Sequence, residues 1–484
     1  MFTERARLLC VVIVVLVVSC SGWFHGATAL DGNNSLELNL FNSWDAFELV
    51  THGDDISAIS DTGYGTTATR SVYDGLGGYL SGGTLSIFIN HETTPASISR
   101  LELDLSDFQQ AIASTIDSGA TAFPSSIATA MGFAYDTIFD DTYHAMTNPN
   151  PVASGTIAVA NYGNSNFSRF CSGSSYLAES FGTDRGFVNQ MYMTGEEVGG
   201  GKFYAMESAT RTLWEVPDVG TDPWENATLV DTGTTTHVAV ILMPDGGSQK
   251  IKMYVGKKGV DANGDGGIDF LERNGLRGGT VHYFDPDGAT TTLPDNGGQI
   301  SGKWSTSTSG ALVETKLEDI HTNPADGTQA VFADQTDGVY TIDISLSFTG
   351  DVLDTANSTA TIKQVVNNST FINSPDNLTW SADGRIYIQE DGGGDDMWHV
   401  NDDGTGITQI ASALSEPSGI YDVSGLVGYS AGSVLLTSMQ GSPAQLAALI
   451  NPSATAIPEP TSACVWALAG LSLLLRRGRR GGRA

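Results

Sequence analysis

Short segments rich in β-branched and aromatic residues recur along most of the chain, each ended by Gly, Asp, Asn or Pro. This is the pattern of strands joined by tight turns, and pairs such as Asp337-Gly338 supply turn positions where a positive φ is easily adopted. Helical candidates are confined to residues 107–118, 125–131 and 443–449. The chain is therefore expected to be all-β. The predicted strands are 85–89, 156–160, 188–193, 202–206, 238–242, 250–255, 280–284, 330–333, 339–344, 385–389 and 433–436.

Many short strands together with 57 glycines favour a β-propeller, a large β-sandwich or a β-barrel. No repeat of fixed period marks the chain, so the strand pattern alone does not select a propeller. Residues 93–151 are richer in helix-forming residues, Ser and Thr, and this segment is interpreted as a small helical insertion between blades. Residues 30–450, between two distinctive terminal segments, form the expected folded domain.

The N-terminal segment, residues 1–29, has the features of a secretory signal peptide. Arg5 and Arg7 precede an apolar run from Leu8 to Val18, and the small residues Ala27-Thr28-Ala29 follow. A basic start, a short apolar stretch and a small-x-small exit are the three parts of such a peptide. An alternative is that residues 17–20 act as a lipobox, in which case Cys20 would carry a lipid. Either way, the protein is expected to be exported.

The C-terminal segment, residues 451–484, is similar to the PEP-CTERM sorting tail of Gram-negative bacteria. Pro458-Glu459-Pro460 precedes an apolar stretch from Ala463 to Leu475, and five arginines follow before the last residue. The resemblance implies transient anchoring in the membrane, followed by cleavage by a sorting and processing machinery that would be a partner of the tail. The expected destination is the cell surface or the extracellular medium.

The formal net charge of −32 restricts the partners of the folded domain. The two terminal segments contain seven arginines and two glutamates, so the domain without them carries a charge of about −37. A surface of this sign repels nucleic acid and attracts divalent cations. Only Cys171 of the four cysteines lies in the domain, which leaves no intramolecular disulfide. Cys171 is interpreted as a small buried hydrophobic residue, and the protein is expected to be a monomer.

A calcium loop is the clearest chemical motif. Residues 261–272 match the twelve-residue EF-hand loop, with a glycine at position 6 for the sharp turn and a glutamate at position 12. The preceding residues 250–255 read as a strand and not as an entering helix, so the loop is expected to be a structural clip between strands. The candidate calcium ligands are Asp261, Asn263, Asp265, Gly267 through its backbone carbonyl, Asp269 and Glu272.

Several separated segments resemble the PhoX-type alkaline phosphatases and their secreted relatives, in the same order along roughly residues 75–395. The segments are Asn90-His91-Glu92, Arg169-Phe170-Cys171-Ser172, Thr194-Gly195-Glu196-Glu197, Trp224-Glu225-Asn226, Tyr254-Val255-Gly256-Lys257-Lys258, Arg273-Asn274-Gly275-Leu276, Leu317-Glu318-Asp319-Ile320 and Pro375-Asp376-Asn377.

The resemblance implies a six-bladed β-propeller with calcium and iron ions grouped at its centre and the hydrolysis of phosphate monoesters. By this resemblance Glu196, Glu197, Glu318 and Asp376 are candidate catalytic metal ligands, and Glu92 and Asp391 are further candidates. Clustered carboxylates are the hard oxygen donors that hold calcium or ferric iron. The family has a cysteine directly before its Glu-Glu pair, whereas Gly195 stands there in this chain, which argues against iron.

His91, beside Glu92, is a candidate general base, and a structural hydrogen-bonding histidine is the alternative. The eight histidines show no zinc-binding spacing. Two functions remain open on the sequence alone. The first is a secreted, calcium-dependent hydrolase of a phosphorylated small molecule. The second is a non-catalytic, calcium-stabilised protein of the cell surface or extracellular matrix. A shared fold alone does not choose between them.

Overall fold

The structure is a computed structural model that describes residues 36–57, 71–120, 127–142, 145–147, 167–288, 290–369, 371–392 and 394–458. The predicted signal segment 1–29, Cys20, the predicted strand 156–160 and the tail from residue 459 onward lie outside these residues. Within the described part of the chain, no helix has the length and apolar character needed to cross a membrane.

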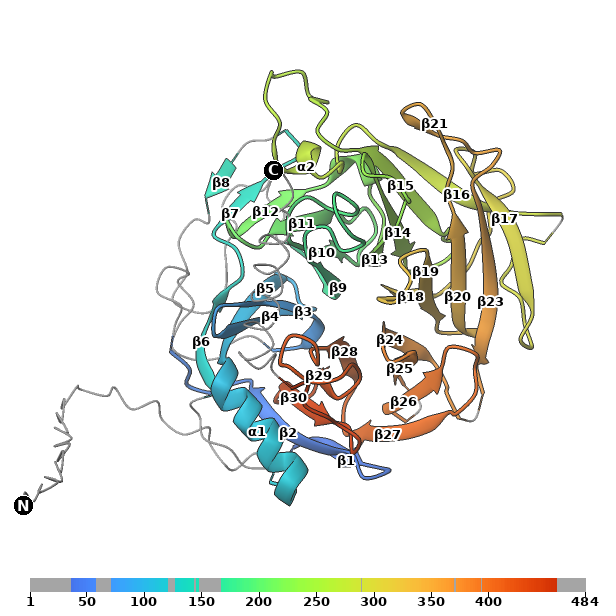
Figure 1. The fold of residues 1–484 in the computed structure, drawn as a ribbon. Coiled ribbons are helices and arrows are strands. Elements are labelled where there is room, and N and C mark those ends of the chain that lie inside the picture. Colours follow the sequence, from blue (N-terminus) through green and yellow to red (C-terminus); the bar gives the residue numbers. More distant parts are fainter. Residues whose placement is uncertain are drawn as a thin grey trace, which may run out of the picture.

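Five β-sheets stand around a common axis and form the six blades of a propeller (Figure 1). Each innermost strand contacts the innermost strand of the next blade, and the last contacts the first, so the ring is closed. The six-bladed propeller implied by the resemblance is thereby confirmed. The inner strands are β3 (Tyr73–Ser81), β9 (Phe170–Tyr176), β13 (Trp224–Val230), β18 (Leu317–Thr322), β24 (Pro375–Trp380) and β28 (Pro417–Asp422).

Blades one and two are each built on four strands that pair antiparallel with their neighbours. From the axis outward, blade one consists of β3, β4 (Thr84–His91), β5 (Ser97–Asp104) and β6 (Ala128–Phe133). Blade two consists of β9, β10 (Met191–Glu196), β11 (Phe203–Glu207) and β12 (Thr212–Glu215). The outer edge of blade two is extended by β7 (Thr137–Phe139), which pairs parallel with β12, and by β8 (Ala145–Thr147).

Blades three and four share one nine-stranded sheet because their outer edges pair through β17 and β23. Blade three consists of β13, β14 (His237–Pro244), β15 (Lys252–Lys257), β16 (Thr280–Pro286) and β17 (Gln299–Ser305). Blade four consists of β18, β19 (Gln329–Asp334), β20 (Gly338–Ser345) and β23 (Thr359–Asn367). Two small elements lie in the connections of this region. The 3-10 turn η1 (Pro217–Val219) precedes β13, and a hairpin of β21 (Phe348–Thr349) and β22 (Val352–Leu353) lies between β20 and β23.

The N-terminal strands complete the last two blades and so close the propeller. Blade five consists of β24, β25 (Arg385–Glu390), β26 (Asp396–Asn401) and β27 (Thr408–Ala413), with β1 (Leu38–Leu40) on its outer edge. Blade six consists of β28, β29 (Val434–Met439) and β30 (Gln445–Ile450), with β2 (Asp45–Thr51) outermost. Pairing the start of the domain with its end removes an open edge from the ring.

The hydrophobic core lies between neighbouring blades, so most central strands are buried on both faces. Strand β14 shows why the sequence folds this way. Its residues 238–243 form a continuous apolar run, and all eight residues of the strand are buried. Continuous apolar runs are typical of strands covered on both faces, and the blades provide that cover.

Each predicted strand within the described residues overlaps an observed strand, although residues 188–190 of the predicted strand 188–193 lie before β10. Two of the three helical predictions are wrong. Helix α1 (Leu105–Ser118) confirms the segment 107–118, and it starts at the N-cap Asp104. Residues 128–131 belong to β6, and 445–449 belong to β30. Short apolar runs do not distinguish a strand from a helix by periodicity, and pairing with β5 and β29 decides these two cases.

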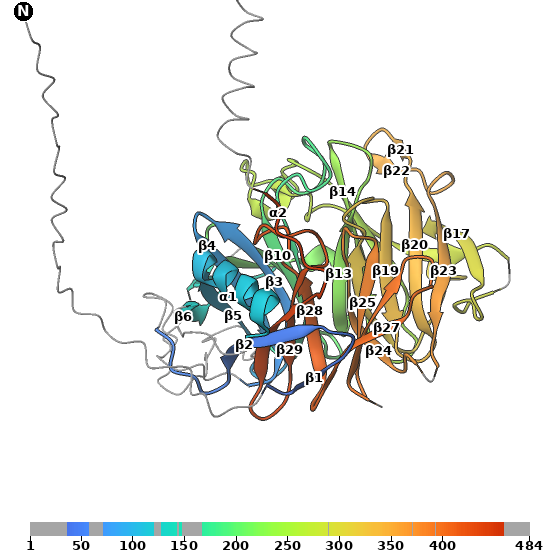
Figure 2. The ribbon, with the colours of Figure 1, turned by 60° about the horizontal axis from the view of Figure 1, so that its bottom comes forward.

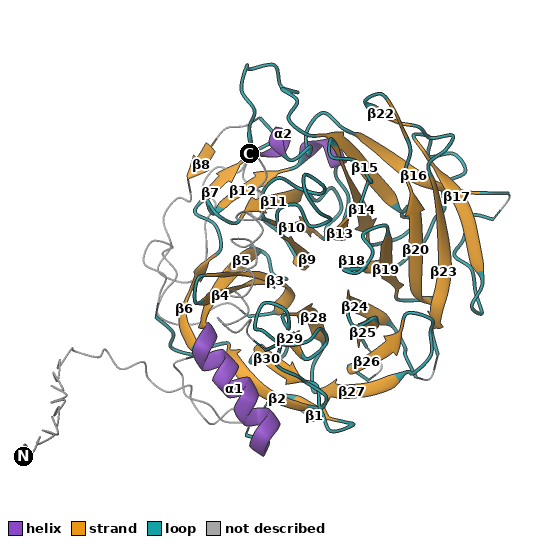
Figure 3. Cartoon of the chain, in the orientation of Figure 1, coloured by secondary structure: helices purple, strands orange, loops and turns teal. Residues whose placement is uncertain are grey.

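Helix α1 is the main helical insertion, and it lies inside blade one, between β5 and β6, and not between blades as predicted. It packs on the outside of the propeller against β5, β2 and β30 (Figures 2 and 3). The second helix, α2 (Phe270–Arg273), closes the predicted calcium loop. The domain also extends beyond residue 450, because Ile457 N donates a hydrogen bond to the carbonyl of Gly428 at 2.8 Å.

Candidate functional site

A polar side chain stands at the second position of every inner strand. A β-bulge occurs at this position in each strand; in β13, Trp224 pairs with Pro244 and Asn226 with Met243, so Glu225 has no partner across the ladder. The other five inner strands show register shifts at the same place. A bulge bends a strand and re-aims a side chain. The six residues are Asp74, Cys171, Glu225, Glu318, Asp376 and Ser418.

A second set of polar residues directly follows the second strand of each blade. Because the second strand runs antiparallel to the first, its end lies beside the start of the inner strand. Gln440 illustrates the contact: its Nε2 donates to Asp74 Oδ2 and Glu92 Oε2, each at 2.9 Å. The six residues of this set are Glu92, Glu197, Asp245, Gln335, Asp391 and Gln440.

Nine of the residues at this end of the axis form one continuous group, called here the axial cluster. Four sets of three potential ligand atoms lie within 4.8 Å of one another, and shared members connect the sets. The sets are Asp74–Glu92–Cys171, Cys171–Glu197–Glu225, Glu225–Glu318–Asp376 and Asp376–Asp391–Glu416. Glu416 lies directly before β28, so each of the six blades contributes to the cluster.

Among the described residues, two basic side chains contact the axial cluster. The Arg169 guanidinium lies 2.5 Å from Glu92 Oε1 and 2.7 Å from Glu197 Oε2. Lys316 Nζ lies 2.7 Å from Glu318 Oε1 and 3.0 Å from Asp245 Oδ2. Two cations do not balance the eight carboxyl groups of the cluster, so a large excess of negative charge remains.

Burial and repulsion from neighbouring carboxylates raise the pKa values of Asp74, Glu197, Glu225, Glu318, Asp376 and Glu416. Burial raises the pKa of Asp376, and Glu416 and Asp391 raise it further. The pKa of Glu197 rises to about 8, because burial outweighs the lowering effect of Arg169. Burial and the charge of Asp391 raise the pKa of Glu416 to about 7. A cation bound among these groups favours their charged forms and so offsets the cost of burial.

A layer of hydrogen bonds beneath the axial cluster ties neighbouring inner strands together. Ser172 Oγ donates to Glu225 Oε1 at 2.6 Å, which connects blades two and three. The backbone N–H of Leu378 donates to Asp319 Oδ2 at 3.0 Å, which connects blades four and five. In this layer Asn90 Nδ2 donates to the carbonyl of Cys171 at 2.9 Å. These bonds hold the bulged strands in position, as a preorganised ligand set requires.

The chemistry of the axial cluster fits metal ions. Oδ1 of Asp74 and Oδ1 of Asp376 are buried and have no hydrogen-bond partner among the described residues. A buried carboxylate oxygen without a partner is costly, and a metal ion would satisfy it. Carboxylates suit calcium and ferric iron, and one thiolate adds a softer ligand.

Of the six metal ligands predicted from the family resemblance, the structure brings five together and leaves one apart. Glu92, Glu197, Glu318, Asp376 and Asp391 all belong to the axial cluster. Glu196 does not, because its carboxylate accepts hydrogen bonds from the Ser168 and Lys202 N–H groups at 2.9 and 3.0 Å. Tyr204 O–H adds a third bond at 3.3 Å. Glu196 therefore stabilises the conformation of the neighbouring backbone. It was predicted to be a metal ligand, but in the structure it lies outside the axial cluster.

His91 is buried within blade one and does not belong to the axial cluster. Its Nε2 lies 2.6 Å from Ser99 Oγ and its Nδ1 lies 3.2 Å from the carbonyl of Ser71. Its ring also makes an edge contact with Tyr73. With both ring nitrogens engaged in the protein, the predicted role as general base is not supported, and the structural role is.

Cys171 and Gly195 both differ from their sequence-based interpretations. Cys171 lies half-buried within the axial cluster and not in a hydrophobic core. A Cβ at residue 195 would lie 2.3 Å from Cβ of Trp224 and 3.0 Å from Cδ2 of Phe203. Position 195 thus faces apolar packing, so Gly195 removes no ligand from the axial cluster. Gly195 therefore does not weigh against iron.

Four members of the axial cluster were not among the predicted site residues, namely Asp74, Cys171, Glu225 and Glu416. The sequence contains a usable signal for Asp74 and Glu225. An apolar residue, then an acid, then Asn, Asp or Gly begins four inner strands, as in Tyr73-Asp74-Gly75 and Trp224-Glu225-Asn226. Glu416 stands one residue before its strand and has no such signal.

The predicted calcium loop lies between β15 and α2, and the strand expected before it is confirmed. Its carboxylates accept hydrogen bonds from the loop's own N–H groups. Asp261 Oδ1 accepts from Gly264 N at 2.7 Å, and Glu272 Oε1 accepts from Ala262 N at 2.7 Å. The loop's carboxylates are not among the groups within 4.8 Å of one another in the described residues. Calcium binding by this loop stays a prediction.

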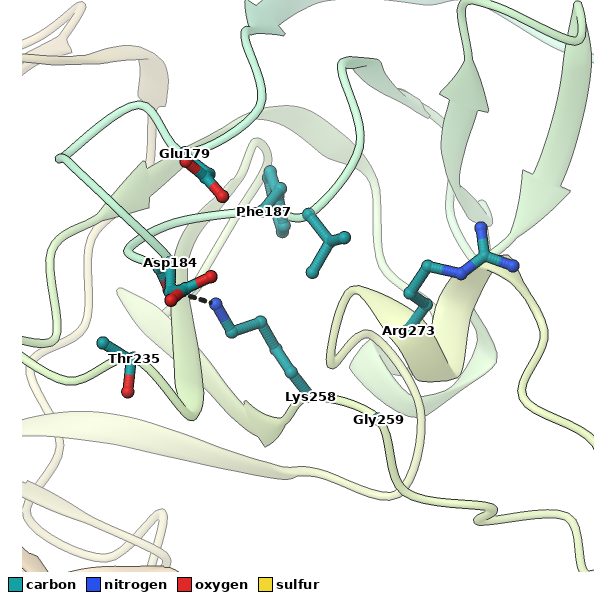
Figure 4. A pocket seen from close by; sticks show the side chains of 8 residues that line it. Glu179, Asp184, Phe187, Thr235, Lys258, Gly259 and Arg273 are labelled. Carbon is teal, nitrogen blue, oxygen red and sulfur yellow. Dashed lines mark hydrogen bonds between the residues drawn. The ribbon is translucent and has the colours of Figure 1, made fainter.

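A surface pocket of about 360 Å³ lies beside the calcium loop and contains no member of the axial cluster (Figure 4). Lys258 and Arg273, which flank the loop, line it together with Glu179 and Asp184. Lys258 Nζ donates to the carbonyls of Asp184 and Gly186 at 2.6 and 3.0 Å. These bonds give the lysine a structural role in joining the loop to the neighbouring segment.

No family model and no curated protein matches the sequence of this chain. In three dimensions the chain is similar to Pseudomonas fluorescens PhoX in complex with vanadate, a transition state analogue. The TM-score is 0.57 at 13% identity, over 87% of this chain and 97% of that chain. A Bacteroides uniformis protein described as a 6-phosphogluconolactonase matches with a TM-score of only 0.29 at 10% identity, over 77% of this chain and 82% of that chain. The likeness to PhoX shows a shared fold.

Proposed function

We propose that this chain is a metal-dependent phosphoric monoester hydrolase that acts at the axial cluster. The observation that carries the proposal is the convergence of eight carboxyl groups and one thiol from all six blades. The same fold in PhoX binds vanadate, a transition state analogue, and the segments of this chain that resemble the PhoX family include Glu197, Glu318 and Asp376.

The four ligand sets suggest how metals are distributed in the cluster. Glu225, Glu318 and Asp376 form an oxygen-only set that suits calcium. The set of Cys171, Glu197 and Glu225 contains a thiol, which suits iron better than calcium. Bound metal ions would supply charge neutralisation for the phosphoryl group and a more acidic bound water.

Arg169 and Lys316 would bind and orient the phosphate. Their side chains are 45% and 33% exposed, whereas Glu318 beside Lys316 is 2% exposed. The two cations therefore lie between the buried carboxylates and solvent. Arginine matches the oxygens of a phosphate with two parallel N–H groups, and lysine adds a mobile point charge.

The setting proposed for this activity is outside the cytoplasm. The signal segment 1–29 and the sorting tail support export and surface display, with the sorting machinery as the partner of the tail. Calcium is abundant there, so the loop of residues 261–272 would be filled and would act as a clip between β15 and α2. The substrate class is a phosphorylated small molecule.

Metal analysis of the mature protein, combined with an assay on p-nitrophenyl phosphate, tests the proposal. We expect bound calcium and iron, and turnover that a chelator removes and added metal restores. Metal-loaded protein without turnover on any phosphomonoester would overturn the hydrolase and leave the non-catalytic, calcium-stabilised surface protein.

A further inference from the structure

We propose that Glu314, Asp334 and Asp337 form a second cation site, separate from the axial cluster, that binds calcium and joins two segments of the propeller. The three residues come from different places: Glu314 precedes β18, Asp334 ends β19, and Asp337 lies in the turn before β20. One carboxylate oxygen of each lies within 4.8 Å of the other two. None of them belongs to the axial cluster.

Glu314, Asp334 and Asp337 are called here the outer triad. One buried carboxylate oxygen of the triad has no hydrogen-bond partner among the described residues, which indicates a missing ligand. Asp334 is 0% exposed. Its Oδ1 accepts hydrogen bonds from the Thr336 N–H at 3.0 Å, the Thr336 hydroxyl at 2.6 Å and the Asp337 N–H at 3.0 Å. Its Oδ2 is equally buried and has no hydrogen-bond partner among the described residues. A buried carboxylate oxygen left in this state needs a cation, a proton or a water.

No positive side chain neutralises the triad. Among the described residues, no lysine, arginine or histidine forms an ion pair with Glu314, Asp334 or Asp337. The nearest basic residue in sequence, Lys316, is engaged with Asp245 and Glu318 instead. The other charges that act on Glu314 are those of Asp334, Asp337 and Asp295, and together with burial they raise its pKa to about 8. The charge of a bound cation would reverse this repulsion.

The ligand type and the position of the triad favour calcium in a structural role. Calcium takes six to eight oxygens in a flexible arrangement, and three carboxylates leave room for carbonyls and water. An isolated β-bridge pairs the backbone of Glu314 with that of Gln249 in blade three. The Oε1 atom of Glu314 accepts a hydrogen bond from the Leu293 N–H at 2.6 Å. Asp334 and Asp337 belong to the β19–β20 hairpin of blade four. A bound ion would thus join blade four to the long segment that connects it to blade three.

Equilibrium dialysis of the mature protein against calcium tests this site. Asp334→Asn and Asp337→Asn should each bind about one calcium ion fewer per chain than the wild type. Asp343→Asn is the matched control, because Asp343 lies exposed on β20 in the same blade, away from the triad, and its Oδ1 accepts a hydrogen bond from the Gln329 side chain. Its calcium count should equal that of the wild type.

Hydrogen exchange with and without calcium locates the effect and separates it from the axial cluster. Calcium should slow exchange at Leu293 and in residues 334–338 of the wild type and of Glu318→Gln, but not of Asp334→Asn. If Asp334→Asn fails to fold, the half-buried Asp337→Asn carries the test. An unchanged calcium count in those of the Asp334→Asn and Asp337→Asn variants that fold, with protection of this turn equal to wild type, would overturn the second site and leave the proposed hydrolase untouched.

Discussion

Asn377 Nδ2 donates a hydrogen bond to Ser172 Oγ at 2.7 Å, although 205 positions separate the two residues in the chain. Asn377 is the third residue of β24 and Ser172 the third residue of β9, and these strands belong to opposite blades. The bond therefore crosses the axis directly beneath the axial cluster. Ser172 Oγ in turn donates a hydrogen bond to Glu225 Oε1, a member of the axial cluster.

Asn377→Ala removes this bond across the axis and leaves Ser172 with one buried contact fewer. We expect the free energy of unfolding to fall by about 1–3 kcal/mol, the usual cost of an unsatisfied buried polar group. Urea unfolding checks this, with Asn373→Ala as the control, because Asn373 lies on the exposed side of the same segment. Equal unfolding midpoints for the two variants would contradict the role given to the bond.

Glu196 and Glu197 are neighbours in sequence but are predicted to respond differently to mutation. Glu197→Gln removes a charge that contacts Arg169 and Cys171, so we expect loss of metal and of activity. Glu196→Gln weakens three hydrogen bonds to the backbone and Tyr204, so we expect a loss of about 2 kcal/mol of stability with metal content retained. Metal analysis and thermal unfolding of both variants check this, and loss of metal from Glu196→Gln would show that the assignment is reversed.

Cys171→Ser replaces the only sulfur ligand of the axial cluster with an oxygen. If the thiolate holds iron, the variant should lose iron while keeping the calcium bound by the oxygen-only sets. Elemental analysis of wild type and variant, purified in parallel, gives the answer. The same iron content in both proteins would show that Cys171 is not an iron ligand and only fills space.

The calcium loop makes a separate prediction. Asp265→Asn and Asp269→Asn each remove a charged ligand, so the calcium-dependent rise in melting temperature should shrink, because a ligand stabilises only the state that binds it. Asp287→Asn, in the loop after β16, is the control. Phosphatase activity at saturating calcium should change little, since the loop shares no residue with the axial cluster. A rise in melting temperature as large as that of the wild type would exclude calcium from the loop.

Much of the fold follows from local patterns in the sequence. Asp383-Gly384 joins β24 and β25 with Gly384 at a φ of 87°, as its sequence predicts. The apolar runs of β14 and β20 likewise correspond to their strands. The number of blades does not follow from local patterns, because insertions of different length separate the inner strands. The family resemblance, and not a repeat, predicted six.

The site was harder to predict because its residues are defined by the bulges of the inner strands. A bulge changes which side chain faces the axis without changing the composition of the strand. Adjacent residues such as Glu196 and Glu197 point in different directions, and the sequence does not tell which of the two reaches the axis. For the same reason Cys171 could not be placed beside Glu197 until the register of β9 and β10 was known.

The axial cluster as a metal centre is tested most directly by anomalous diffraction from crystals of the mature protein grown with calcium and iron. We predict anomalous peaks on the propeller axis at about 2.4 Å from carboxylate oxygens of Glu225, Glu318 and Asp376. A further iron peak is expected within bonding distance of Cys171 Sγ. Well-ordered cluster side chains that contact only water, with no anomalous peak among them, would contradict the account.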